Sequence, residues 1–246
     1  MRTTVAALVA LASCLTSRAL CQDGSPSKTP IFEVTLGKPG EELVHSFKTR
    51  SELDDMLRRT TIKGPVGFSH PAAGPESESP ACMNWYNVTY GGGEVDLSLK
   101  LDSPLQDKPM TVQLGPAEYF LTPAQQLTDG PPKDIPEKLG MFKAYRVVSS
   151  KNVVAVQAKI PNSFSKTESV ALKQPAYICL PCEEQHHEES FEILDPEACW
   201  LVYETEPSPV ASIIASTDQL GIHRIKGGDT KFFFVPVKTI ASKPNR

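Results

Sequence analysis

Apolar and polar residues alternate along much of this chain with the two-residue period of a β-strand. In the segment from 94 to 101, single polar residues separate four apolar ones, Val95, Leu97, Leu99 and Leu101. Because successive side chains of a strand point to opposite faces, this pattern predicts a strand with one buried face. Short apolar runs bounded by Gly- and Pro-containing turns fill the chain beyond Cys82. The pattern predicts a predominantly all-β fold with antiparallel pairing.

Three apolar segments share one layout and recur at nearly constant spacing. They are Pro116–Pro123 (PAEYFLTP), Pro175–Cys182 (PAYICLPC) and Asp229–Pro236 (DTKFFFVP). Their closing prolines, Pro123, Pro181 and Pro236, are 58 and 55 residues apart. An aromatic residue stands four positions before each proline: Tyr119, Tyr177 and Phe232. Self-similarity at a period above about 50 residues indicates one supersecondary unit that is used several times.

The period divides the C-terminal two thirds into three β repeats, about 82–127, 141–185 and 198–240. Each repeat contains about four short strands and closes on a hairpin, which its proline should end because proline cannot donate to a ladder. Three such units can form a sandwich, a barrel-like assembly or a propeller-like array. Small sandwich-like units packed side by side are the favoured arrangement.

The N-terminal part, residues 22–63, is expected to hold two strands and one short helix. The strands are Ile31–Leu36 and Glu42–Phe47, joined by a turn at Pro39-Gly40. The helix should begin at a capping box of Ser51 and Asp54 and end near Arg59. Residues 64–81 are rich in proline, serine and small residues, and this composition predicts a linker.

The first 21 residues have the features of a signal peptide. Arg2 precedes an apolar run from Val5 to Leu15 that is too short to span a membrane, and small residues favour cleavage after Cys21. Alternatively, Leu11–Cys14 has the form of a bacterial lipobox, in which Cys14 would be acylated. Both possibilities predict a secreted, periplasmic or cell-envelope protein. No later stretch is long enough for a transmembrane helix.

Composition and charge argue against a nucleic-acid partner. The chain carries 25 basic and 29 acidic residues, and removal of residues 1–21 takes away two arginines. The remaining net charge of −6 would repel a phosphate backbone, and no basic stripe stands out. The 22 prolines and 15 glycines fall between short apolar runs, which favours strands and turns over long helices.

The repeat resembles an uncharacterised tandem-repeat family of secreted bacterial proteins, whose units open on a Cys-Tyr-Lys type strand and close on Leu-Cys-Val-Pro. The resemblance rests on YICLPC at Tyr177–Cys182, FVPV at Phe234–Val237 and TPA at Thr122–Ala124, with openings KAYRVV at Lys143–Val148 and CW at Cys199-Trp200. It covers Cys82–Ile240. It implies secretion and a β fold, but no activity or ligand.

Four cysteines remain after the signal peptide: Cys82, Cys179, Cys182 and Cys199. An even number in an exported chain favours structural disulfides. The favoured pairing is Cys182 with Cys199 and Cys82 with Cys179, because Cys179 should point into the sheet while Cys182 lies near the acidic connector. A bridge between Cys182 and Cys199 would stabilise the fold by roughly 3 kcal/mol in the chain-entropy model.

A zinc site is the alternative for the same segment. Cys179, Cys182, His186 and His187 form C-x-x-C-x-x-x-H-H, and thiolate and imidazole are ligands that zinc prefers. A redox-active C-x-x-C is less favoured, because such a pair gains reactivity at a helix N-terminus and acidic residues follow here.

No catalytic frame is recognisable. The carboxylates are plentiful, but no motif pairs them for acid–base work. Asn87-Val88-Thr89 is an N-glycosylation sequon within a predicted strand, and the sequence does not decide whether Asn87 is modified. The predicted function is therefore that of an exported, non-catalytic β-repeat protein with a structural or binding role and an unknown protein or glycan partner. The alternatives are a zinc-binding envelope protein without other cofactors and, third, an extracellular hydrolase.

Overall fold

The structure is a computed structural model of the chain. It describes residues 30–51, 53, 56–73, 82–91, 95–128, 135, 139–160, 169–186, 188–210 and 212–244. All regular elements in these ranges are β-strands, and their pairings are antiparallel, so the all-β prediction is confirmed. Among the same residues there is no helix with the length and hydrophobicity needed to cross a membrane.

The described chain forms fifteen strands. They are β1 (Ile31–Pro39), β2 (Leu43–Ser51), β3 (Arg58–Ala73), β4 (Cys82–Tyr90), β5 (Leu97–Asp102), β6 (Met110–Gln126), β7 (Met141–Lys151), β8 (Val156–Lys159), β9 (Ser169–Leu172), β10 (Pro175–His186), β11 (Glu189–Phe191), β12 (Trp200–Pro209), β13 (Ile214–Asp218), β14 (Gly221–Pro236) and β15 (Lys238–Pro244). β5 shows the predicted alternation, because Leu99 and Leu101 are buried while Lys100 and Asp102 are exposed.

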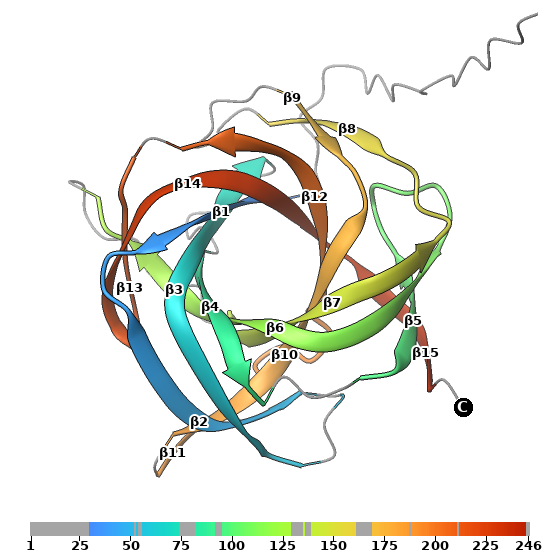
Figure 1. Cartoon of the computed structure of the whole chain (residues 1–246). Helices are drawn as coiled ribbons and strands as arrows, with labels where there is room; N and C mark the ends of the chain where they lie inside the picture. Colours follow the sequence, from blue (N-terminus) through green and yellow to red (C-terminus); the bar gives the residue numbers. More distant parts are fainter. Residues whose placement is uncertain are drawn as a thin grey trace, which may run out of the picture.

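Eight of these strands close into a barrel, which Figure 1 shows in a view along its axis. The order around the ring is β1, β3, β4, β6, β7, β10, β12 and β14, and β14 pairs again with β1. The expected sandwich-like units are therefore wrong, since each unit donates strands to one common ring. Closure gives each of these strands a hydrogen-bonding neighbour on both sides, which separate units would not achieve.

Four consecutive units build the ring, one more than the sequence period predicts. Each unit runs as an opening barrel strand, a shorter excursion outside the ring, and a closing barrel strand. The units are β1–β3, β4–β6, β7–β10 and β12–β14, with β2, β5, the β8–β9 pair and β13 as excursions. The N-terminal unit was not predicted, because its closing segment has Gly67 four positions before Pro71, where the other units have an aromatic residue.

Large side chains, most of them aromatic, fill the lumen of the barrel. Trp200 stacks on Phe142 with ring centroids 4.3 Å apart and on Phe234 at 4.9 Å. Phe32 stacks on Phe234 at 4.5 Å. Each such pair adds about 0.5–1.5 kcal/mol beyond the burial of its area. The stack therefore joins the first, third and fourth units. The interior of an eight-stranded barrel is just wide enough for side chains to fill it.

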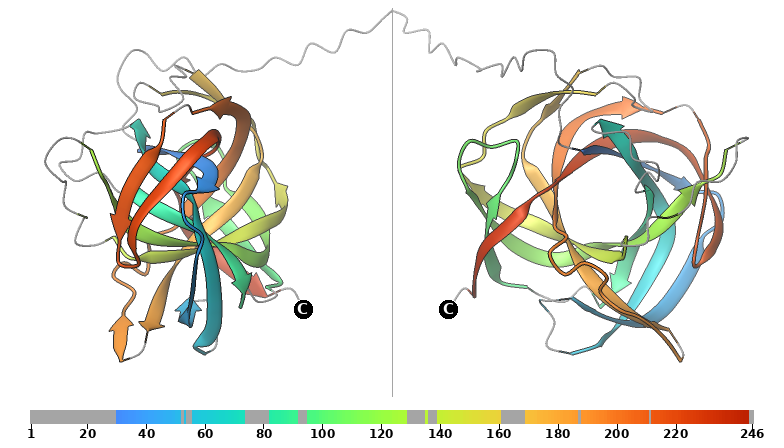
Figure 2. Two further views of the ribbon diagram at one scale, coloured as in Figure 1. Left: turned by 60° about the vertical axis from the view of Figure 1, so that its left-hand side comes forward. Right: turned by 180° about the vertical axis from the view of Figure 1, so that it is seen from behind.

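The excursions cover the outer face of the barrel, as the two further views in Figure 2 illustrate. Leu101 of β5 and Val170 of β9 belong to one outer cluster with Ile178 of β10. On another part of the wall, Phe47 of β2 packs with Phe120 of β6. The barrel strands are thus buried on both faces, which explains why their closing segments are continuous apolar runs rather than alternating ones.

Pro123 and Pro181 mark a change of partner strand rather than a strand end, whereas Pro236 ends β14 as predicted. Pro123 lies within β6 and pairs with Met83 of β4, whereas the β6–β7 ladder stops at Leu121. Pro181 likewise pairs with β7 after the β10–β12 ladder has stopped at Cys179. A residue without an N–H is tolerated where one of two ladders has ended. β6 and β10 therefore continue past their prolines, to β13 and β2 respectively.

Two N-terminal predictions need correction. The helix expected from Ser51 to Arg59 is absent from the described part of the chain: Ser51 ends β2, Arg58 begins β3, and residues 52, 54 and 55 lie outside the described residues. The predicted linker 64–81 is strand as far as Ala73, and 74–81 is outside the described residues. This segment is a strand because it pairs with β1 on one side and with β4 on the other, and its Phe68 side chain is fully buried.

Candidate functional site

One end of the barrel carries four cross-strand pairs, one from each unit, which we call the mouth. The pairs are Leu36 with Gly67, Asn87 with Tyr119, Arg146 with Tyr177, and Glu204 with Phe232. Leu36, Tyr119, Tyr177 and Phe232 pack against the lumen cluster. Asn87, Arg146 and Glu204 each lie two residues beyond a lumen side chain of the same strand and so share its face. Three of the four units thus present a polar residue beside an aromatic one.

The three aromatic rings of the mouth form a continuous row. Tyr119 and Tyr177 meet edge to face with centroids 5.2 Å apart, and Tyr177 meets Phe232 in the same way at 5.6 Å. All three side chains are half-buried, so each has one part in the lumen and one part in solvent. The remaining unit has Gly67 at this position and so contributes no ring; a Cβ there would lie 2.4 Å from Leu36 Cδ2. The row is therefore open on that side.

Glu118 connects two of the mouth residues. It accepts a hydrogen bond from the Tyr177 hydroxyl at 2.9 Å. It also forms an ion pair with Arg146, whose Nη1 is 3.1 Å from the carboxylate. Burial raises the pKa of Tyr177, with smaller contributions from the neighbouring Tyr119 and from the hydrogen bond to Glu118, so its hydroxyl stays protonated and donates. The hydrogen bond that Arg146 donates to Glu118 raises the pKa of Arg146. The network orients the Tyr177 ring across the mouth.

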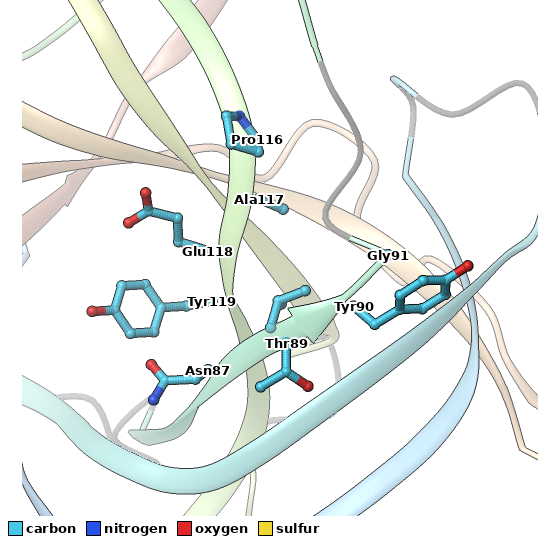
Figure 3. Close-up of a pocket in the computed structure, with 9 residues that line it drawn as sticks. Asn87, Thr89, Tyr90, Gly91, Pro116, Ala117, Glu118 and Tyr119 are labelled. Atoms are coloured by element: carbon cyan, nitrogen blue, oxygen red, sulfur yellow. The ribbon is translucent and has the colours of Figure 1, made fainter.

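A cavity of about 490 Å³ adjoins this network, between β4 and β6 (Figure 3). The ladder between these strands stops at the Asn87–Tyr119 pair, and the cavity opens where they separate. Asn87, Glu118 and Tyr119 line it, and Figure 3 shows their side chains extending to the same side. Glu118 reaches that side because the β6–β7 register shifts between Ala117 and Tyr119. The cavity has the size of a small-molecule site, about 300–1,000 Å³.

A second polar cluster lies on the outer face of the barrel, beneath the β13–β14 hairpin, with Asp218 at its centre. Asp218 Oδ1 accepts hydrogen bonds from His223 Nε2 and the Leu220 N–H, both at 2.8 Å. Its Oδ2 accepts from Asn84 Nδ2 at 2.8 Å, the Tyr86 hydroxyl at 2.7 Å and the Thr122 hydroxyl at 2.5 Å. Although burial raises it, these side-chain hydrogen bonds hold the pKa of Asp218 below its ordinary value.

This cluster has the components of an acid–base site but not its accessibility. The side chains of Asp218 and His223 are 0% and 1% exposed. Tyr86 is fully buried, and burial raises its pKa far above the ordinary value. A substrate must come within hydrogen-bond distance of a general base, and here the hairpin occupies that space. The arrangement therefore serves to hold the hairpin on the barrel.

Two other excursions hold the barrel by the same contact. Ser51 at the end of β2 is hydrogen-bonded to the Tyr145 hydroxyl at 2.6 Å and accepts the Leu53 N–H. Ser103 after β5 is hydrogen-bonded to the Tyr203 hydroxyl at 3.4 Å and accepts the Leu105 N–H. Asp218 does the same with Tyr86 and Leu220. In each case the excursion of one unit caps a tyrosine of the unit two places away in the chain. We call these contacts the tyrosine caps.

Two further ionisable residues lie near the Asp218 cluster. Glu184 is 1% exposed and accepts a hydrogen bond from Gln219 Nε2 at 2.7 Å. Burial raises the pKa of Glu184 to about 7, with a smaller contribution from Asp218. Burial also lowers the pKa of His45, whose Nε2 is buried without a hydrogen-bond partner in the described structure. These groups make the cluster sensitive to pH.

The structure corrects the predicted cysteine pairing. Cys82, Cys179, Cys182 and Cys199 are all buried and none forms a disulfide. They lie in four different apolar clusters, so neither Cys82–Cys179 nor Cys182–Cys199 is formed. Burial, and then the neighbouring Cys199, raise the pKa of the Cys179 thiol, which makes that thiol unreactive.

The predicted zinc ligands do not converge either. Cys179 lies in the lumen cluster, whereas Cys182 lies in an outer cluster, because residues three apart on a strand face opposite sides. His186 packs against Phe47 on the outside, and His187 lies outside the described residues. Among the described residues no group of three His, Cys, Asp or Glu side chains is placed to hold a metal ion.

Sequence reasoning missed both the mouth and the tyrosine caps, although each has a sequence signal. Ser51-x-Leu53 and Ser103-x-Leu105 both begin 20 residues before a closing proline, and Asp218-x-Leu220 begins 18 before Pro236. The mouth aromatics are anchors of the sequence repeat, but their polar partners can be assigned only once the cross-strand register is known. The sequon residue Asn87 turns out to be one of those partners.

Comparison with known proteins identifies a family but no activity. Residues 82–238 match the family model DUF7450, described as a repeat of unknown function. No curated protein and no solved structure matches the chain significantly. The matched residues comprise the second, third and fourth units, and the resemblance to an uncharacterised repeat family is confirmed. The chain belongs to the DUF7450 family of repeats of unknown function.

Proposed function

We propose that this protein is an exported, non-catalytic binding protein of the cell envelope that holds its ligand at the barrel mouth. One observation carries the proposal. The mouth is where lumen-facing positions change from buried apolar side chains to half-buried aromatic ones, each paired with a half-buried or exposed polar residue, and it adjoins a cavity of about 490 Å³. Concave sites with aromatic walls and a few convergent polar groups are the usual places for small ligands.

Trp85 provides a reporter for ligand binding at the mouth. It lies in the lumen directly below Tyr119, with ring centroids 5.6 Å apart. Its buried indole N–H has no hydrogen-bond partner in the described structure. Because the chain has only two tryptophans, Trp200→Phe leaves Trp85 as the sole indole fluorophore. Calorimetry on the unaltered chain serves as an independent measurement.

The test is a titration with four probes of different chemistry: inorganic phosphate, tetramethylammonium, dodecanoate and cellopentaose. We expect at least one to change the Trp85 emission in a saturable manner and to bind at least tenfold more weakly to Tyr177→Ala. Ile222→Ala is the control, because Ile222 is 72% exposed on the β13–β14 hairpin outside the barrel. If no probe saturates, or if Tyr177→Ala binds as well as the control, the mouth is not the site.

The non-catalytic and export parts of the proposal have separate tests. A bound probe recovered intact by mass spectrometry supports binding without turnover, and a cleaved probe would overturn it. Export predicts a mature N-terminus at Gln22, readable by N-terminal sequencing of protein recovered from the culture medium or periplasm. An acylated Cys14 in the membrane fraction would support the lipid-anchored alternative, and an intact Met1 would refute export.

A further inference from the structure

We infer that the ligand at the barrel mouth is a neutral saccharide, stacked by a sugar ring face on Tyr119, beside the Tyr177 ring that meets Tyr119 edge to face, and hydrogen-bonded through its hydroxyls to Asn87, Glu118 and Arg146. The inference rests on the proposed binding function of the mouth and adds the chemical class of the ligand. Charge, aromatic geometry and the packing of the lumen support it separately.

Charge at the mouth favours a neutral ligand. Arg146 is already paired with Glu118, and the nearby Glu204 adds a further negative charge. An anionic ligand would meet two carboxylates for one guanidinium. A cation would have to compete with Arg146 for Glu118. A neutral ligand meets neither cost, and it can use the hydrogen-bonding capacity that the amide of Asn87, the carboxylate and the guanidinium retain.

The aromatic row supplies the other half of a sugar site. A pyranose ring has one face of C–H groups and a rim of hydroxyls, so it needs an aromatic surface beside polar groups. Each of three mouth pairs places these two kinds of group directly opposite one another: Asn87–Tyr119, Arg146–Tyr177 and Glu204–Phe232. Tyrosine suits this role because its ring offers a rigid apolar surface and its hydroxyl a polar end.

Packing of the lumen argues against a lipid or another long apolar ligand. An acyl chain would need an apolar channel, but the stacked rings of Phe32, Phe142, Trp200 and Phe234 fill the lumen below the mouth. The cavity lies instead at the rim, where β4 and β6 separate, and polar residues share its lining. The site is therefore shallow and mixed in polarity, as a saccharide end or a single sugar ring requires.

The experiment compares neutral oligosaccharides with charged probes on the full mature chain. Cellopentaose, maltopentaose and chitopentaose are titrated calorimetrically, alongside inorganic phosphate and tetramethylammonium. We expect at least one saccharide to bind, with an affinity that is unchanged between about 0.05 and 0.5 M salt because a neutral ligand has no charge to screen. Tyr119→Ala should weaken it at least tenfold, while Tyr119→Phe, which keeps the ring face, should weaken it less than threefold.

A matched pair of arginine variants tests the polar half of the site. Arg146→Gln should weaken saccharide binding about three- to tenfold. Arg50→Gln should leave it unchanged, because Arg50 forms a similarly exposed ion pair with Glu183 away from the mouth. Equal effects of the two variants would overturn the assigned role of Arg146.

The outcomes separate this inference from the proposed function. If phosphate or tetramethylammonium binds at the mouth and no saccharide does, the saccharide inference is wrong and the binding function stands. A saccharide that binds equally well to Tyr119→Ala also refutes the inference. If no probe of any class binds at the mouth, both fail.

Discussion

The tyrosine caps at Ser103 and at Asp218 occupy equivalent places in two units but differ in charge. Ser103 contacts the Tyr203 hydroxyl at 3.4 Å, and Ser51 makes the corresponding contact in the first unit. Asp218 contacts Tyr86 at 2.7 Å and also gathers His223, Asn84 and Thr122. The backbone arrangement is common to all three, since each capping side chain accepts the N–H of the leucine two residues on.

The difference shows how a repeated structural contact acquires dependence on charge. A serine hydroxyl has few hydrogen-bonding sites, so a neutral cap adds about 0.5–1.5 kcal/mol. A carboxylate has about four lone-pair sites and can accept several donors at once. Asp218 uses this capacity, and Asn84 is oriented toward it because the Ser216 hydroxyl donates to Asn84 Oδ1 at 2.7 Å. The charged cap is therefore stronger, but its partners depend on one ionised group.

Replacing the charged cap by a neutral one should cause the largest loss in the free energy of unfolding. Asp218→Ser copies the cap of the other units, yet it leaves the buried donors of His223, Asn84 and Thr122 without their acceptor. We expect a loss of about 3–5 kcal/mol in the free energy of unfolding, measured by urea denaturation. Ser103→Ala, the reference, should lose about 0.5–1 kcal/mol. A loss below about 1 kcal/mol for Asp218→Ser would show that the two caps are energetically alike.

Removing single tyrosine hydroxyls should give the next largest difference. Tyr86→Phe loses a hydrogen bond to a carboxylate and should cost about 1.5–3 kcal/mol. Tyr145→Phe loses a hydrogen bond to a neutral serine and should cost about 1 kcal/mol. Both tyrosine side chains are fully buried, so the two variants differ mainly in the hydrogen bond that each loses. Equal costs in urea unfolding would contradict the role assigned to the charge of Asp218.

The smallest effect is on pH dependence and involves Glu184. Its folded pKa of about 7 is above the ordinary value of 4.5, so the folded protein holds this proton more tightly than the unfolded chain. The stabilisation is complete below about pH 4.5 and is lost as pH rises through 7. Relative to the wild type, Glu184→Gln should therefore gain about 1–2 kcal/mol between pH 5 and pH 7.

Two other groups titrate in the opposite direction and provide an internal control. The depressed pKa of Asp218 and the lowered pKa of His45 both contribute stability that is lost on acidification. Destabilisation by His45 as pH falls below its ordinary pKa of 6.5, and by Asp218 below about pH 4, should therefore remain in Glu184→Gln, so the test rests on the difference between this variant and the wild type. If unfolding of Glu184→Gln keeps the pH dependence of the wild type between pH 5 and pH 7, Glu184 is not the titrating group.

Much of the second, third and fourth units could be predicted from sequence. The opening and closing strands occur where the repeat pattern lies in the sequence: β4–β6 spans Cys82–Gln126 and β7–β10 spans Met141–His186. The anchors Tyr119, Tyr177 and Phe232 are equivalent in the structure as they are in the sequence. Such positions repeat because each unit meets the same lumen. The residues of the tyrosine caps could also have been aligned between units, but their role depends on hydrogen-bond donors from units that are distant in the sequence.

Sequence alone determined the β class, the period of the repeat and the apolar positions, because these follow from side-chain alternation and from turn residues that act locally. Only the tertiary structure decided that a fourth unit closes the ring, since β1 must meet β14 across nearly the whole chain. It also decided which face each residue joins. Cys179 and Cys182 are neighbours in sequence but lie on opposite faces, whereas Tyr86 and Asp218, 132 residues apart, form one hydrogen bond. Cross-strand register sets these contacts, and register depends on all strands of the closed sheet together.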